Sequence, residues 1–195
     1  IDEMRIDNAS PWRRKLLQLL RTYYGRAAAF GDAVPIVESW IENASPLVAD
    51  YNVENITAIC GRLGLDSSHL VRSSTLPVNG AQTELLVNIV KAVGGDTYLS
   101  GDGSAGYQDD AVFMASGIEV VYQRFVHPEY PQRGLTEFIP GLSILDAIFN
   151  PGFAGAAQLL DVTRRAEPGQ ASPAPKPPLQ PTREPTVRRR RVRSS

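Results

Sequence analysis

The sequence lacks the residues that build a disulfide framework, a cysteine zinc site or a membrane span. Cys60 is the single cysteine among 195 residues, so neither an intrachain disulfide nor a Cys-based zinc site can form. No apolar run reaches the roughly 18 to 20 residues that cross a bilayer. No signal peptide is visible at the N-terminus. These absences predict a cytoplasmic protein, and no residue pattern indicates a metal or a particular cofactor.

Charge is unevenly distributed along the chain, although the overall net charge is only -1. From residue 164 onward there are nine Lys or Arg and two Asp or Glu, which gives +7. The preceding residues hold 11 basic and 19 acidic side chains, which gives -8. An acidic body excludes a broad nucleic-acid footprint, because neutralising phosphates takes clustered Lys and Arg. Binding to nucleic acid or to an acidic membrane surface is therefore expected only through the tail.

The same boundary divides the composition. Seven of the 15 prolines fall between Pro168 and Pro185, and the chain closes on RRRRVRSS. A segment with so few apolar residues cannot offset the entropy lost on ordering. We therefore predict an α/β domain over residues 1–163, long enough for one buried core, followed by a disordered Pro/Arg-rich tail over 164–195.

Apolar periodicity within the first 163 residues alternates between helical and extended patterns. Ser10 is expected to cap the first helix, with Pro11 in its first turn. A helix followed by a short β-rich run is half of a parallel βαβ unit, so the pattern predicts an α/β fold. The predicted helices span about 12–24, 34–41, 53–63, 83–93 and 144–149, and the predicted strands 1–6, 69–73, 97–100 and 118–125.

A glycine-rich segment follows the strand at 97–100 and reads LSGDGSAGY. Glycines let the backbone approach a ligand and direct N–H groups at an anion or a carbonyl oxygen. The segment fits G-x-G-x-x-G, yet its aspartates oppose a phosphate ligand. A dinucleotide site, an ordinary strand-exit loop and another small-molecule contact all remain open. The candidate substrate-binding residues here are Ser100, Gly101, Gly103 and Tyr107, together with Gln123 at the end of the next strand.

A second polar constellation is the segment HPEYPQ. Its two prolines stiffen the backbone, so His127, Tyr130 and Gln132 should have fixed directions. His127 is a candidate general base, because histidine titrates near neutral pH. The alternative is a rigid connector whose histidine and tyrosine cap neighbouring backbone.

The third constellation is LSILDAIFN. Ser143 is placed to cap the helix that follows, and Asp146 lies three residues later, in capping-box position. Capping alone explains both residues. Asp146 also interrupts an apolar face, so it is equally a candidate to orient His127 or a substrate hydroxyl. Near the N-terminus, Arg13 and Arg14 beside Trp12 form either a solvated first turn or a grip for an anionic group.

Several segments in this order resemble the WbqC-like family of bacterial proteins. They are RIDNASPWRRKLL, YYGRA, LGLDSSHL, TYLSG with Tyr107, GIEVVYQ, HPEYPQ, FIP and LSILDAIFNPG, which run from Arg5 to Gly152. The resemblance implies a Rossmann-like, mixed or mostly parallel sheet flanked by helices. Family members usually open with an apolar strand and a Gln-Pro-x-Tyr-x-Pro-Trp type segment. That segment does not precede Ile1, so we expect an N-terminally truncated member.

The resemblance also implies a role in surface-polysaccharide biosynthesis, by transfer of an acyl or aminoacyl group to an amino-sugar intermediate. The expected substrate is a small molecule or is linked to a carrier. In this hypothesis His127 and Asp146 are catalytic, Asp146 orients His127, and backbone N–H groups near Gly101 and Gly103 stabilise an oxyanion. Tyr130, Gln132 and Ser143 join the substrate-binding set. A non-catalytic binding module and an inactive fragment are the alternatives.

Overall fold

The computed structural model describes residues 3–101, 103, 108–123 and 125–165. Residues 166–195 of the predicted tail and Tyr107 lie outside these residues, while Arg164 and Arg165 end α7. The elements, in chain order, are α1 (Trp12–Tyr24), α2 (Phe30–Ile41), α3 (Val48–Arg62), a 3-10 turn (Ser73–Thr75), α4 (Gln82–Ala92), β1 (Thr97–Ser100), α5 (Asp110–Ala115), β2 (Glu119–Tyr122), α6 (Ile144–Phe149) and α7 (Gly152–Arg165). In this described part of the chain, no helix is long and apolar enough to cross a membrane.

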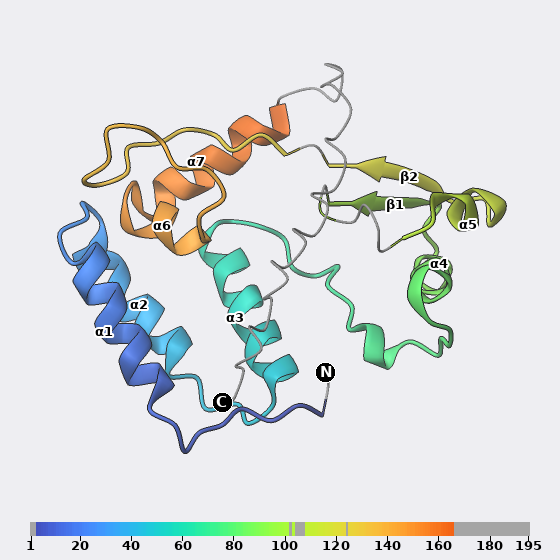
Figure 1. Cartoon of the computed structure of the whole chain (residues 1–195), viewed down its shortest axis with the longest axis horizontal. Coiled ribbons are helices and arrows are strands. Elements are labelled where there is room, and N and C mark those ends of the chain that lie inside the picture. The colour runs from blue at the N-terminus through green and yellow to red at the C-terminus, as the bar shows by residue number, and fades with distance from the viewer. Residues whose placement is uncertain (1–2, 102, 104–107, 124, 166–195) are drawn as a thin grey trace, which may run out of the picture.

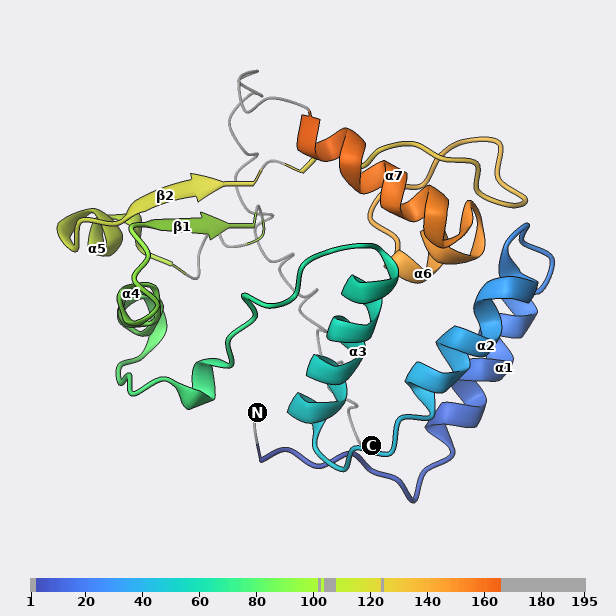
Figure 2. The same cartoon turned by 180° about the vertical axis from the view of Figure 1, so that it is seen from behind.

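The elements form two groups that lie on opposite sides of the molecule in both views (Figures 1 and 2). We call α4, β1, α5 and β2 the α/β unit, and α1, α2, α3, α6 and α7 the helical region. Both strands of the α/β unit point their carboxyl ends toward the helical region. The chain that leaves β2 therefore runs directly onto α6 and α7.

The α/β unit is one parallel strand pair packed against two helices. β1 and β2 pair in register from Thr97 opposite Glu119 to Ser100 opposite Tyr122. Alternate strand residues face α4 and α5, where Tyr98 stacks on the fully buried Phe113 at 4.8 Å between ring centroids. On the other face Leu99 is 63% exposed, so that face is uncovered.

The fold class is therefore a mixed α/β protein with a small parallel sheet, which confirms the coarse prediction. A Rossmann-like sheet is not confirmed, because the described residues contribute only two strands and both helices pack on one face. Two predicted strands are wrong. Residues 3–6 form a single antiparallel bridge, from Arg5 to Leu47 in the connection between α2 and α3. Residues 69–72 form a turn and irregular chain that leads into the 3-10 turn at Ser73.

The helical region contains the larger core. Val37 of α2 and Ile148 and Phe149 of α6 are almost completely buried, and Phe149 packs against the rings of Tyr24 and Phe30 at about 5 Å. Gly152 starts α7 with a φ of +81°, and a Cβ there would meet the Ala29 side chain at 3.2 Å. Only glycine therefore allows α7 to begin so close to Ala29, the N-cap of α2.

The N-cap of α1 and the number of helices also differ from the sequence prediction. Pro11 is the N-cap of α1, without a side-chain cap, and the Ser10 amide instead donates to the Asp7 carboxylate at 3.3 Å. α5 and α7 were not predicted. α5 has only six residues and α7 has two glycines among its first four, which lowers its helix propensity, so both helices depend on the tertiary contacts they make.

Candidate functional site

A cavity of about 240 Å³ lies where the chain after β2 crosses α6 and α7. We call it the inner cavity. Three side chains of the predicted site line it: His127, Tyr130 and Ser143. The rest of the lining is mainly apolar and includes Phe125, Ile144 and Leu159. The structure thus assembles a hollow with an apolar wall and a few polar groups, the usual composition of a small-molecule site.

A buried carboxylate lies beside this cavity. Asp146, on α6, is 4% exposed, and its Oδ2 accepts hydrogen bonds from the Tyr130 hydroxyl at 2.7 Å and from Gln132 Nε2 at 3.1 Å. Gln132 is itself fixed, because it donates to the Ile139 carbonyl and accepts from the Ile139 amide. The carboxylate therefore ties the loop between β2 and α6 to α6 itself.

Tyr24, at the end of α1, is a further donor to Asp146. Burial raises the pKa of Tyr24 to about 12, and the Asp146 charge and a hydrogen bond to it add to this. Burial likewise raises the pKa of Tyr130 to about 12, followed by its hydrogen bond to Asp146. Both hydroxyls are consequently protonated at neutral pH and act as donors. We call Tyr24, Tyr130, Gln132 and Asp146 the Asp146 cluster.

His127 is exposed at the edge of the inner cavity. Its ring meets the edge of Phe125 at 4.9 Å and 90°. The structure shows no hydrogen bond between His127 and Asp146, so the predicted orienting contact is corrected. Asp146 is instead engaged by Tyr130 and Gln132, which lie closer to α6 in the folded loop. Neither imidazole nitrogen of His127 has a hydrogen-bond partner among the residues that the structure describes.

Ser143 and Asp146 have separate roles, which resolves the capping question raised by the sequence. Ser143 is the N-cap of α6, where its Oγ accepts from the Leu145 amide at 3.3 Å. The Asp146 carboxylate does not complete a capping box, because it faces Tyr130 and Gln132. The Ser143 oxygen acts as acceptor in the cap, so its hydroxyl proton can be donated into the inner cavity.

The other predicted residues lie in the α/β unit and do not line the inner cavity. Ser100, at the end of β1, is buried, and its Oγ donates to Gln108 Oε1 at 2.9 Å. Gln123 is exposed and is joined to Ser100 through its backbone amide. Gly101 and Gly103 are exposed on the loop after β1. The structure thus brings His127, Tyr130 and Ser143 to one cavity, whose lining does not include Ser100, Gly101, Gly103 or Gln123.

A second carboxylate–tyrosine pair occupies this end of the α/β unit. The Tyr122 hydroxyl donates to Asp110 Oδ2 at 2.8 Å, and Gln108 Nε2 contacts both side chains. The hydrogen bond to Asp110 raises the pKa of Tyr122. Asp109 caps α5 through the Ala111 amide. The acidic residues after the glycine-rich segment are thus engaged within the protein.

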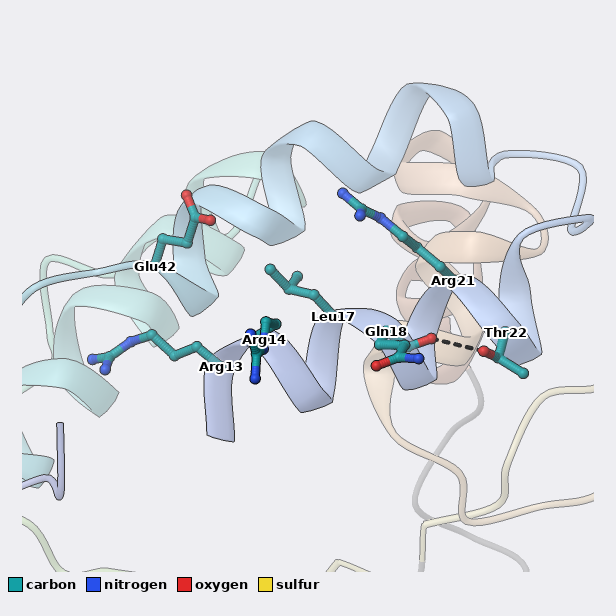
Figure 3. Close-up of a pocket in the computed structure, with 7 residues that line it drawn as sticks. All are labelled: Arg13, Arg14, Leu17, Gln18, Arg21, Thr22 and Glu42. Carbon is teal, nitrogen blue, oxygen red and sulfur yellow. Dashed lines mark hydrogen bonds between the residues drawn. The ribbon is translucent and has the colours of Figure 1, made fainter. Parts of the chain in front are cut away.

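The two N-terminal arginines behave differently from one another (Figure 3). Arg13 donates to the carbonyls of Ile41 and Asn43 at the end of α2, and its guanidinium lies 4.4 Å over the Trp12 ring. It therefore closes the C-terminus of α2. Arg14 lines an open groove at α1 together with Arg13, Arg21 and Glu42.

Three side chains near the inner cavity were missed by the sequence analysis: Tyr24, Phe138 and Asn150. Asn150 accepts from the Arg133 amide and donates to the Asp146 carbonyl, so it also holds the loop against α6. Only Asn150 had a signal, as a polar residue closing an apolar helix. No group of three or more His, Cys, Asp or Glu side chains suited to a metal ion occurs within the residues that the structure describes.

The sequence model of the WbqC-like protein family matches residues 1–157, which include the loop after β2, α6 and the start of α7 at the inner cavity. The chain belongs to the WbqC-like protein family. The match includes the loop after β2 and α6, so the Asp146 cluster of this WbqC-like protein lies in the part of the chain that defines membership.

This WbqC-like protein is also similar to one curated relative, the uncharacterized protein Rv1507c of Mycobacterium tuberculosis. The two are 29% identical over 154 residues, which is 78% of this chain and 65% of Rv1507c. The chain thus spans slightly less than two thirds of the length of that relative. No solved structure matches this WbqC-like protein. The comparisons therefore establish the family, without a named reaction.

Proposed function

We propose that this protein is a biosynthetic enzyme that transfers an acyl or aminoacyl group to the amine of a sugar-linked intermediate in surface-polysaccharide biosynthesis. The observation that carries the proposal is the inner cavity, whose lining is mainly apolar with His127 exposed at its edge. The protein is proposed to act in the cytoplasm, on a small or carrier-linked substrate.

The inner cavity has room to enclose one part of the substrate and is too small for a whole sugar-linked molecule. At about 240 Å³ it is smaller than the roughly 300–1,000 Å³ of sites that enclose a drug-sized ligand. An apolar wall suits an acyl chain or an apolar amino-acid side chain, because burying apolar surface is the main source of its binding energy. The polar acceptor would then remain at the edge, next to His127.

The chemical step would be attack of the acceptor amine on the carbonyl carbon of an acyl ester or thioester. A nitrogen–carbon bond forms and the carbon–oxygen or carbon–sulfur bond breaks. His127 takes the proton from the attacking amine and returns it to the departing alcohol or thiol. The Ser143 hydroxyl is the donor available in the inner cavity for the carbonyl oxygen.

The Asp146 cluster would act on the shape of the site. Asp146 is 4% exposed and is engaged by its donors, so it is poorly placed to meet a substrate. By fixing Tyr130 and Gln132 it holds the loop that carries His127. Asp146 is thus a positioning residue in this proposal, and Tyr130 is the group through which it acts on the inner cavity.

A non-catalytic binding module is the second candidate, and one observation favours it. Within the described residues His127 has no hydrogen-bond partner that would orient its ring, whereas general bases in enzymes are commonly oriented by a third group. A module that only holds an acylated carrier needs the inner cavity and no oriented base. The two candidates differ in whether His127 affects turnover or binding alone.

The test is product formation. The protein is incubated with acyl thioesters and aminoacyl esters and with nucleotide-linked amino sugars, and the amide is detected by mass spectrometry. We expect His127→Ala to lower the rate by about 100-fold or more, as removal of a general base does. His69→Ala is the matched control, because His69 is exposed beside Asp66 in a turn and does not line the inner cavity.

The outcomes separate the candidates. Amide formation that depends on His127 and not on His69 supports the enzyme. If His127→Ala forms the amide at the wild-type rate, the assignment of the base is wrong. Binding of the acylated donor without any amide, by wild type and both variants alike, supports the binding module.

A further inference from the structure

A second cavity adjoins the inner one across a wall of two aromatic rings. It has a volume of about 340 Å³, and we call it the outer cavity. Tyr130 and Phe138 line both cavities. Their rings meet edge to face, with centroids 5.2 Å apart and planes at 71°. These two side chains are therefore the partition between the two hollows.

The two halves of the partition are held with different firmness. Tyr130 is tethered by its hydroxyl to Asp146 at 2.7 Å, and Asp146 is buried on α6. Phe138 has no such tether and is held by ring packing and by the neighbouring Ile139, which is bonded through its backbone to Gln132. Substitution of Phe138 consequently opens the partition, while the Asp146 cluster keeps all its donors.

We propose that the Phe138 ring sets the maximum length of the acyl group that the inner cavity accepts. This inference rests on the proposed function, in which the inner cavity takes the acyl part of the donor. A chain longer than the inner cavity meets the Tyr130–Phe138 partition. Without the Phe138 ring the chain continues into the outer cavity along Leu135 and Pro131, which lie there beside polar side chains that include Glu129, Thr136 and Glu137.

The energetics give this proposal a distinct signature. Each buried methylene strengthens binding by about fourfold, which corresponds to about 0.8 kcal/mol. Affinity should therefore rise stepwise with chain length and then fall at the length that reaches the partition, because overfilling a packed site forces side chains out of their rotamers. The chain length at which affinity stops rising reports where the partition lies. The rise in affinity at shorter chain lengths reports burial in the inner cavity.

The experiment uses the whole chain and a series of N-acyl glycinamides from acetyl to dodecanoyl, with dissociation constants measured by calorimetry. These probes are uncharged and need no turnover. We expect Phe138→Ala to move the turning point to a longer chain, while affinity still rises by a similar factor per methylene before that point. Leu135→Ala is the matched control, because Leu135 lines only the outer cavity and its loss leaves the partition intact.

The results distinguish this inference from the proposed function. If wild type binds the series and Phe138→Ala keeps the same turning point, the partition role is overturned and the acyl site survives. If wild type binds no member of the series, the acyl site fails and the partition role fails with it. Phe138→Leu retains an apolar side chain of intermediate size, so it tests the same shift should the alanine variant unfold, and an unchanged turning point there also overturns the inference.

Discussion

The helical region and the α/β unit each contain a carboxylate hydrogen-bonded to a tyrosine. Asp146 accepts from Tyr130 at 2.7 Å and Asp110 accepts from Tyr122 at 2.8 Å, so the two hydrogen bonds have nearly the same length. They differ in burial, because Asp146 is 4% exposed whereas Asp110 is exposed. An aspartate–tyrosine hydrogen bond therefore holds buried structure together in the helical region, whereas in the α/β unit it is a surface contact.

Burial decides what each pair can do. In the helical region water cannot replace a lost partner, so breaking the contact leaves unsatisfied donors next to the inner cavity. In the α/β unit water competes for every donor and acceptor, so the contact adds little stability. A site that requires fixed side-chain directions is consequently better supported in the helical region, although the α/β unit holds the glycine-rich segment.

The largest effect should come from removing one core phenylalanine in each region. Phe149 and Phe113 are both completely buried, so Phe149→Ala and Phe113→Ala should each lower the free energy of unfolding by about 3–5 kcal/mol. Only Phe149→Ala should weaken acyl-glycinamide binding, since Phe149 lies on α6 and packs against Tyr24 of the Asp146 cluster. Urea unfolding with calorimetry measures both. Equal loss of binding in the two variants would show that the regions are not independent.

The next contrast concerns the two carboxylates themselves. Asp146→Asn should lower the free energy of unfolding by about 1–3 kcal/mol, because the amide cannot accept from all the donors that surround the carboxylate. Asp110→Asn should change it by no more than about 0.5 kcal/mol, as expected for an exposed substitution. Both values come from urea unfolding at neutral pH. Similar costs at the two sites would contradict the argument from burial.

This contrast also shows how far the sequence could predict the molecule. Helical periodicity located α1 and α6 well, and the alternation of patterns predicted the parallel pair of β1 and β2. The rigid segment HPEYPQ and the helix with Asp146 were both singled out, and they meet at the inner cavity. Their local chemistry was visible because proline stiffness and a polar residue on an apolar face are local signals.

What the sequence could not predict depends on contacts between distant segments. Tyr24 lies more than 100 residues before Asp146, and Phe138 is an unremarkable aromatic residue in a loop. Conversely, the glycine-rich segment looked functional because glycine and serine permit ligand contact, yet Ser100 is engaged with Gln108 within the α/β unit. Local pattern identifies the residue types that suit a site, and only the tertiary fold selects which of them meet.

Alkaline pH should distinguish the two tyrosine pairs in a third test. The pKa of Tyr130 is raised from 10.0 to about 12, so its contribution to stability is complete below pH 10 and is lost as pH rises through about 12. Tyr24 behaves in the same way. The free energy of unfolding, measured by urea at stepped pH, should fall across this window, and Tyr130→Phe should flatten the fall.

Tyr122→Phe is the control for this titration. The pKa of Tyr122 is also raised, by its hydrogen bond to Asp110, but solvent reaches the pair and weakens the coupling. The Tyr122→Phe curve should therefore follow wild type closely. A flattening as large as that of Tyr130→Phe would mean that the surface pair is coupled to folding as strongly as the buried one.

The smallest effects should separate the two neighbouring arginines. Arg13→Ala removes donors from the Ile41 and Asn43 carbonyls and should lower the free energy of unfolding by about 0.5–1.5 kcal/mol. Arg14→Ala removes an exposed side chain that has no hydrogen-bond or ion-pair partner among the described residues, so a change within about 0.5 kcal/mol is expected. Thermal and urea unfolding of the two variants, run side by side, measure the difference. A larger cost for Arg14 than for Arg13 would contradict the stabilising role given to the Arg13 contacts with α2. It would also show that burial, which separates Asp146 from Asp110, does not rank polar contacts throughout the helical region.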